Sequence, residues 1–262
     1  MSRVEIPSEN QLGPLPTVLF GDPAVTKKGV VVVQEWWGMN QQIQDEAKQI
    51  SEEGSFVTIV PDLYRGKVAT DNEEAGHLMG NLDWSGAVKD IAACARFLKE
   101  KGCSKVGVTG FCMGGALSFA AAALVPEVDA AAPFYGIPSP DLCDVSTIKI
   151  PLQCHFGDQD QVAGFSDPTA QKILKEKLVN VKHEFFVYPA GHAFTNTKSP
   201  NYIGFSDPTA QKALKKKLAK VKHEFYVYHA AHAFTNRTSP NYNEAACKLS
   251  FERMYQFFKS NL

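Results

Sequence analysis

The stretch GVTGFCMGGA, residues 107–116, places Cys112 between glycines directly after the short apolar run Val106–Thr109. A strand followed at once by a nucleophilic residue flanked by glycines is typical of a nucleophile elbow, a strained strand-to-helix turn that exposes the central side chain above a sheet. A helix that begins just beyond the cysteine points its positive N-terminal end toward the sulfur, which favours a thiolate. The stretch therefore predicts a reactive cysteine, with simple packing of a buried thiol as the alternative.

Short apolar runs alternate with amphipathic segments around this stretch, which is the pattern of parallel strands joined by helices. Buried strands are expected at Val30–Gln34, Phe56–Val60, Val106–Thr109, Ala130–Phe134 and Leu152–Phe156. An N-terminal pair, Val4–Ile6 and Thr17–Phe20, is expected to supply edge strands. Helices are expected at Gln41–Glu53, between Asn40 as N-cap and Gly54 as stop, at Trp84–Lys101 and at Ala116–Val125. The alternation predicts a doubly wound, mostly parallel α/β sheet in a single domain of residues 1–262.

A repeat interrupts this pattern near the C-terminus, where residues 164–203 are followed by a near-identical copy at residues 204–243. Each copy reads as a helix with Asp and Pro at its start, then a strand, then a histidine loop. Repeat arrays need about three or more units to bury a continuous core. Two copies therefore indicate a local tandem duplication, either natural or an artefact of the gene model.

The composition limits the partners of the chain. Of its 262 residues 44% are hydrophobic, and its net charge is −1, which gives no electrostatic reason to bind nucleic acid or an anionic membrane. The longest apolar run, Phe119–Val125, is too short to span a bilayer, and the first residues lack the features of a secretory signal. Six cysteines have no metal-type or disulfide-type spacing. We therefore expect a cytoplasmic monomer that acts on a small molecule and needs neither a metal nor another cofactor.

A thiol nucleophile needs a base and an acid that orients the base, and both candidates follow Cys112 in workable order. The strand Leu152–Phe156 leads into Gly157-Asp158-Gln159-Asp160, and a further strand leads into the loop of His192. Both loops then lie at strand C-termini, where open α/β sheets place their ligands. Alone, an aspartate here is more often a turn residue and a histidine more often a surface or core group, so it is the joint order that carries weight.

Four motifs together resemble the dienelactone hydrolase family of α/β-hydrolases: Cys112 in GFCMGG, Asp160 in GDQD, His192 in AGHAF and Glu35 in VVVQEWWG. The resemblance runs from about Gly29 to the C-terminus, and it implies an α/β-hydrolase fold and hydrolysis of a lactone or ester through an acyl-cysteine.

The same resemblance implies a role for each matched residue. Cys112 would be the nucleophile, His192 the general base and Asp160 its orienting acid, while Glu35 would interact with the resting thiol and control its ionisation. The backbone N–H groups of Trp36 and Met113 would bind the oxyanion.

Two positions depart from the family pattern. Bacterial members carry arginines, which grip a substrate carboxylate, where Asn72 and Asn196 stand in this chain. Losing these bidentate donors should weaken selection for an anionic lactone. Tyr64 and Arg65, in contrast, are expected as an exposed loop pair, with a pocket contact as the alternative.

The duplication leaves two candidates for the base. We expect His192 because its distance from Asp160 suits one helix and one strand, and because Gly191 precedes it where the second copy has Ala231. His232 is the alternative, since the helix expected at Glu244–Ser260 follows only the second copy. Two other functions remain open: a non-catalytic binding or thiol-redox protein on the same fold, and an acyltransferase.

Overall fold

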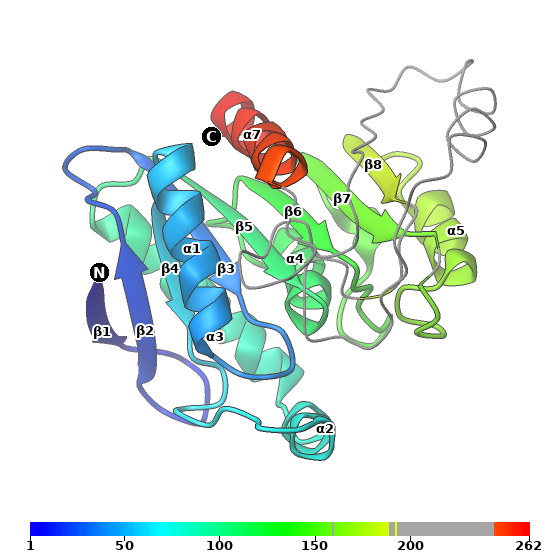
Figure 1. Ribbon diagram of the computed structural model, residues 1–262, viewed down its shortest axis with the longest axis horizontal. Coiled ribbons are helices and arrows are strands. Elements are labelled where there is room, and N and C mark those ends of the chain that lie inside the picture. The colour runs from blue at the N-terminus through cyan, green and yellow to red at the C-terminus, as the bar shows by residue number, and fades with distance from the viewer. Residues whose placement is uncertain (159, 189–191, 193–243) are drawn as a thin grey trace.

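The computed structural model describes residues 1–158, 160–188, 192 and 244–262. Eight strands form one sheet in the order β1-β2-β4-β3-β5-β6-β7-β8 (Figure 1). Their bounds are Ser2–Ile6, Leu15–Phe20, Lys28–Val33, Val57–Pro61, Lys105–Phe111, Ala130–Phe134, Leu152–Gly157 and His183–Tyr188 for β1 to β8 in turn. All pairings from β4 to β8 are parallel, and only β1 with β2 and β2 with β4 are antiparallel. The predicted doubly wound sheet with an N-terminal edge pair is confirmed.

Helices cover both faces of this sheet. They are α1 Gln41–Gly54, α2 Asn72–Gly80, α3 Trp84–Glu100, α4 Met113–Leu124, the 3-10 helix η1 Val145–Thr147, α5 Pro168–Lys177 and α7 Glu244–Asn261. Figure 1 shows α1 and α7 together on one face, where Tyr255 and Phe258 of α7 pack edge-on against Phe56. Helices α3 and α4 bury their apolar sides against the opposite face.

The central strand β3 explains why both faces need cover. Val31 and Val33 lie in the core under α3 and α4, while Val30 and Val32 lie in the core under α1 and α7. Successive side chains of a strand point to opposite faces, so a continuous valine run requires burial on both sides.

Helix boundaries mostly follow the predicted signals, with two differences. The Asn40 side chain caps α1 as expected, but the left-handed residue that ends this helix is Ser55, with φ 59°, and Gly54 is its last helical residue. Helix α4 begins at Met113 and not at Ala116, because the chain turns into the helix directly at the elbow.

The two sequence copies differ in what the structure describes. In the first copy, α5 begins after an Asp167 cap with Pro168 in its first turn, and β8 adds to the sheet beside β7. The second copy, residues 204–243, lies outside the described residues, so its packing stays a prediction. Among the described helices, none combines the length and the apolar character needed to cross a membrane.

Candidate active site

The turn between β5 and α4 holds Cys112 in a strained conformation. Its φ is 55° and its ψ is −114°, a region that costs a non-glycine residue about 1–3 kcal/mol. A Cβ at Gly110 would collide with the carbonyl of Gly114, and one at Gly114 would collide with the carbonyl of Val33. The Cys112 N–H donates to the Phe134 carbonyl at 3.1 Å. Glycines at these two positions therefore let the turn pack tightly enough to present the thiol at the C-terminal end of β5.

His192 lies between this thiol and a buried carboxylate. Its Nε2 is 3.1 Å from Cys112 Sγ, and its Nδ1 is 2.8 Å from Asp160 Oδ2. The Asp160 side chain is fully buried and that of His192 is 13% exposed. Burial alone disfavours the imidazolium, but the hydrogen bonds to Asp160 and Cys112 outweigh it and raise the pKa of His192 to about 10. The three side chains can thus form a thiolate–imidazolium pair oriented by a carboxylate.

A second group reaches the same ring nitrogen. Ser166 Oγ lies 2.8 Å from His192 Nδ1, and Ser166 is fully buried. Its position follows from the Asp160 loop, in which the Val162 N–H donates to Asp160 Oδ1 at 3.0 Å and the Ser166 N–H donates to the Val162 carbonyl at 3.0 Å. One loop therefore supplies both partners of Nδ1.

Glu35 follows β3 and lies in a buried acidic cluster. The Tyr135 hydroxyl donates to Glu35 Oε1 at 3.4 Å, and the Tyr135 ring meets the His192 ring edge-on at 5.6 Å. Glu46 of α1 is also buried, and burial together with the nearby Glu35 carboxylate raises the pKa of Glu46 well above its usual range. Burial, followed by Glu35, likewise raises the pKa of Tyr135. Tyr135 has φ 36°, so two neighbouring strands, β5 and β6, both end at a strained residue facing the site.

The two candidate oxyanion donors follow two strand ends, Met113 directly after Cys112 and Trp36 directly after Glu35. Met113 is the first residue of α4, and its N–H is one of those that the helix itself does not satisfy. Trp36 follows Glu35 in a turn closed by the Gly38 N–H to the Glu35 carbonyl at 3.3 Å.

The expectation of an exposed Tyr64–Arg65 loop pair is wrong. Tyr64 is only 8% exposed, and its hydroxyl contacts Met113 Sδ at 3.2 Å. Arg65 makes a bidentate ion pair with the fully buried Asp90, both N···O distances being 2.9 Å. A buried carboxylate with no cation would be costly, so Asp90 on α3 determines where Arg65 lies.

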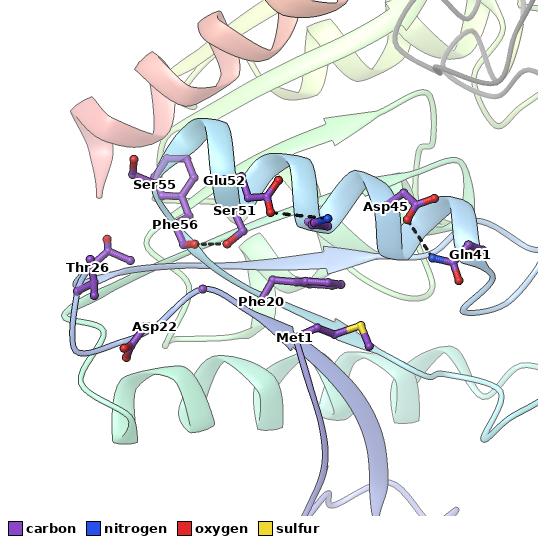
Figure 2. Close-up of a pocket in the computed structure, with 13 residues that line it drawn as sticks. Met1, Phe20, Asp22, Thr26, Gln41, Asp45, Ser51, Glu52, Ser55 and Phe56 are labelled. Atoms are coloured by element: carbon purple, nitrogen blue, oxygen red, sulfur yellow. Dashed lines mark hydrogen bonds and ion pairs between the residues drawn. The ribbon is translucent and has the colours of Figure 1, made fainter.

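Hollows on the surface of the described part of the chain include two of several hundred Å³. Figure 2 shows one of about 610 Å³ between the N-terminal edge of the sheet and α1, and neither Cys112 nor His192 lines it. The other, of about 730 Å³, is lined by Tyr64 but, like the first, by neither Cys112 nor His192. Its ionisable lining residues are mostly acidic: Asp71, Glu73, Glu74 and Asp83, against Arg65, Lys67 and His77.

The comparison with protein families agrees with this geometry. The model of the dienelactone hydrolase family matches residues 15–218, and a second match covers residues 203–262. The chain belongs to the dienelactone hydrolase family. The second match begins at the junction of the two copies, as expected when a dienelactone hydrolase segment is present twice.

Individual relatives cover most of the chain. Protein usf of Aquifex pyrophilus is 36% identical over 200 residues, which are 71% of this chain and 82% of that protein. A carboxymethylenebutenolidase of Pseudomonas putida is 32% identical over 199 residues, 71% of this chain and 83% of that protein. The crystal structure of a dienelactone hydrolase-like promiscuous phosphotriesterase from metagenomic libraries has a TM-score of 0.68 at 17% identity and covers 99% of this chain and 98% of that one. The fold is that of an α/β-hydrolase, and membership of the dienelactone hydrolase family places the chain among hydrolases of lactone or ester bonds.

The structure brings together Cys112, His192 and Asp160, and Glu35 is linked to His192 through Tyr135. Asp158 is exposed. His232 and Asn196 lie outside the described residues. Sequence reasoning missed Ser166 and Glu46. Glu46 had a signal, because a carboxylate three residues after Ile43 falls on the buried stripe of α1. Ser166 had no such signal in the sequence, because a serine is an ordinary residue to find before the Asp-Pro pair that begins α5.

Proposed function

We propose that the chain is a cysteine-dependent hydrolase of small lactones or esters that works through an acyl-cysteine. The observation that carries this proposal is the 3.1 Å separation of Cys112 Sγ and His192 Nε2, with Asp160 on the other ring nitrogen. A nucleophile, a base and a carboxylate that orients the base are the parts that acyl transfer to a thiol requires.

In the first half-reaction the Cys112 thiolate attacks the carbonyl carbon of the substrate. The C–S bond forms as the carbonyl electrons move to oxygen, and the N–H groups of Trp36 and Met113 donate to the oxyanion. When the intermediate collapses, the C–O bond to the leaving group breaks. The departing alkoxide takes the Nε2 proton of His192, which leaves an acyl-cysteine and a neutral imidazole.

In the second half-reaction water attacks the acyl-cysteine. The Nε2 of His192 takes a proton from water, the new C–O bond forms, and collapse of the intermediate breaks the C–S bond. The products are a carboxylic acid and the regenerated thiolate–imidazolium pair. Asp160 holds the ring in place through both halves, because its carboxylate accepts from Nδ1–H both when the ring is charged and when Nε2 has lost its proton.

Glu35 affects when the thiol ionises. Its carboxylate lies in the same buried cluster as Tyr135 and Glu46, and Glu35 and Cys112 both act on Tyr135. A negative charge near the sulfur disfavours a second negative charge there. The preferred substrate carries no carboxylate, because Asn72 supplies no cation to hold one. A cytoplasmic monomer stays a prediction.

The test is turnover of an activated aryl ester by the wild type and by Cys112→Ala. We expect the variant to lose about 10⁴-fold or more of kcat/KM while its thermal unfolding stays unchanged, because one small side chain leaves the site. Cys143→Ala, which removes a buried thiol elsewhere, is the matched control and should keep wild-type activity.

Undiminished turnover in Cys112→Ala contradicts the nucleophile assignment. No turnover by the wild type favours the binding or thiol-redox alternative. An acylated amine formed in preference to the free acid, when an amine competes with water, identifies an acyltransferase instead.

A further inference from the structure

Ser166 makes a contact that the hydrolytic mechanism above does not use. Its Oγ is 2.8 Å from His192 Nδ1, the same atom that Asp160 Oδ2 approaches to 2.8 Å. The serine is fully buried, and its carbonyl accepts from Gln171 Nε2 at 2.7 Å, which anchors it to α5. The hydroxyl is therefore held at the ring by the backbone around it.

Two partners on one nitrogen affect the charged ring most. In the imidazolium both nitrogens carry protons, and the partners of these protons are then all acceptors: Cys112 Sγ at Nε2, and Asp160 and Ser166 at Nδ1. A hydrogen bond to the charged form favours that form. Because the two Nδ1 partners approach from different residues of one loop, they also restrict rotation of the ring away from the thiol.

We propose that Ser166 is a positioning residue for His192, which stabilises the imidazolium and aims Nε2 at Cys112. This inference rests on the proposed function, in which His192 is the base. The serine and the histidine belong to the same sequence copy, residues 166 and 192, and the second copy repeats the pair at the same spacing as Ser206 and His232. Each copy thus encodes a histidine together with its own serine, while Asp160 precedes both copies and is present once.

Other ionisable groups face His192 from every strand end around it. Cys112 follows β5 and Asp160 follows β7, and both contact His192 directly, while Tyr135 follows β6 and lies edge-on to the ring. Glu35 is bonded to Tyr135, Glu46 of α1 lies near Glu35, and Tyr64 lies near Cys112. None of these groups changes in a variant of Ser166. A shift in the pH dependence of activity or alkylation in a Ser166 variant therefore measures the effect of losing the serine hydroxyl.

The experiment compares the wild type, Ser166→Ala and Ser51→Ala. Ser51 is a matched control, since it is a buried serine near the C-terminal end of α1 whose hydroxyl donates to the Phe56 carbonyl at 2.8 Å (Figure 2). For each protein, kcat/KM for an aryl ester and the rate of Cys112 alkylation by iodoacetamide are measured across pH, with the modified peptide identified by mass.

For Ser166→Ala we expect kcat to fall about tenfold with little change in KM. The alkaline limb of both profiles should move down by about one pH unit, because a lost acceptor lowers the pKa at which the imidazolium releases its proton. Ser51→Ala should match the wild type in both measurements.

Profiles of Ser166→Ala that superimpose on the wild type overturn the proposal. A uniform loss at every pH, with an unchanged alkylation profile and a lower unfolding temperature, assigns Ser166 a structural role only and also overturns it. The alkylation profile reads the thiolate–imidazolium pair without ester turnover, so a shifted profile in a protein that hydrolyses nothing supports the role of Ser166 while it refutes the proposed function.

Discussion

The nucleophile and the base of the site are held in different ways. Cys112 is held by backbone packing in the middle of the sheet, where Gly110, Gly114 and the Phe134 carbonyl leave no other path for the chain. His192 is held by side chains, with Asp160 and Ser166 on one nitrogen and Cys112 on the other. The difference teaches that the elbow depends on backbone contacts with the neighbouring strands β3 and β6, whereas the position of the base depends on side chains from a distant loop.

The largest effect is expected when the two histidines of the duplicated segment are compared. His192→Ala should lower kcat/KM by about 10²- to 10⁴-fold, because it removes the general base. His232→Ala should change kcat/KM little. Steady-state kinetics on both variants, side by side, provides the measurement, and an inactive His232→Ala beside an active His192→Ala would reverse the assignment.

A pair of helix glycines tests whether the elbow is as tightly packed as proposed. Gly114→Ala should destabilise the fold by about 1–3 kcal/mol and lower activity, because its Cβ would meet the Val33 carbonyl. Gly76→Ala, at a position with open space in α2, should instead stabilise the fold by about 0.5–1 kcal/mol. Urea unfolding measures both. Equal stabilities would mean that the elbow accepts a side chain.

The same contrast explains how much of the molecule the sequence could predict. The valine run of β3 and the glycines around Cys112 form recognisable short patterns in the sequence, so the sheet, most helix bounds and the nucleophile could be predicted from them. Arg65 was assigned wrongly because its partner, Asp90, lies 25 residues away on α3. Ser166 could not be found because nothing in its own neighbourhood indicates that His192 would lie beside it.

The buried His155 leads to a prediction about how the stability of the fold depends on pH. It is stacked on Phe134 at 4.2 Å, and burial lowers its pKa to about 3. As the pH falls below about 6.5, His155 takes up a proton in the unfolded chain but not in the folded protein. The free energy of unfolding therefore decreases as the pH falls from about 6.5 toward about 3.

His155→Gln should therefore remove up to about 2 kcal/mol of the stability difference between pH 7 and pH 5. The exposed His77, replaced in His77→Gln, is the control and should keep the wild-type pH dependence. Urea titrations at the two pH values decide the question, and a His155→Gln protein with the wild-type pH dependence would show that this histidine titrates normally.

The smallest effect is expected for substrate charge. Neutral esters should react at least as fast as matched carboxylates, because Asn72 carries no charge with which to hold a carboxylate. The measurement is kcat/KM for a neutral and an anionic ester of the same acyl group. A preference for the anion of about a hundredfold, worth roughly 3 kcal/mol, would mean that other cations line the site.

The central claim, that Cys112 carries the acyl group, can be tested by trapping. The protein is mixed with an aryl ester of a slowly hydrolysed acid, quenched in acid during turnover, digested and analysed by mass spectrometry. We predict that the peptide with Cys112 gains one acyl group and that Cys112→Ala gains none. Acylation of another side chain, such as Ser166, or steady turnover with Cys112 unmodified throughout, would contradict the account.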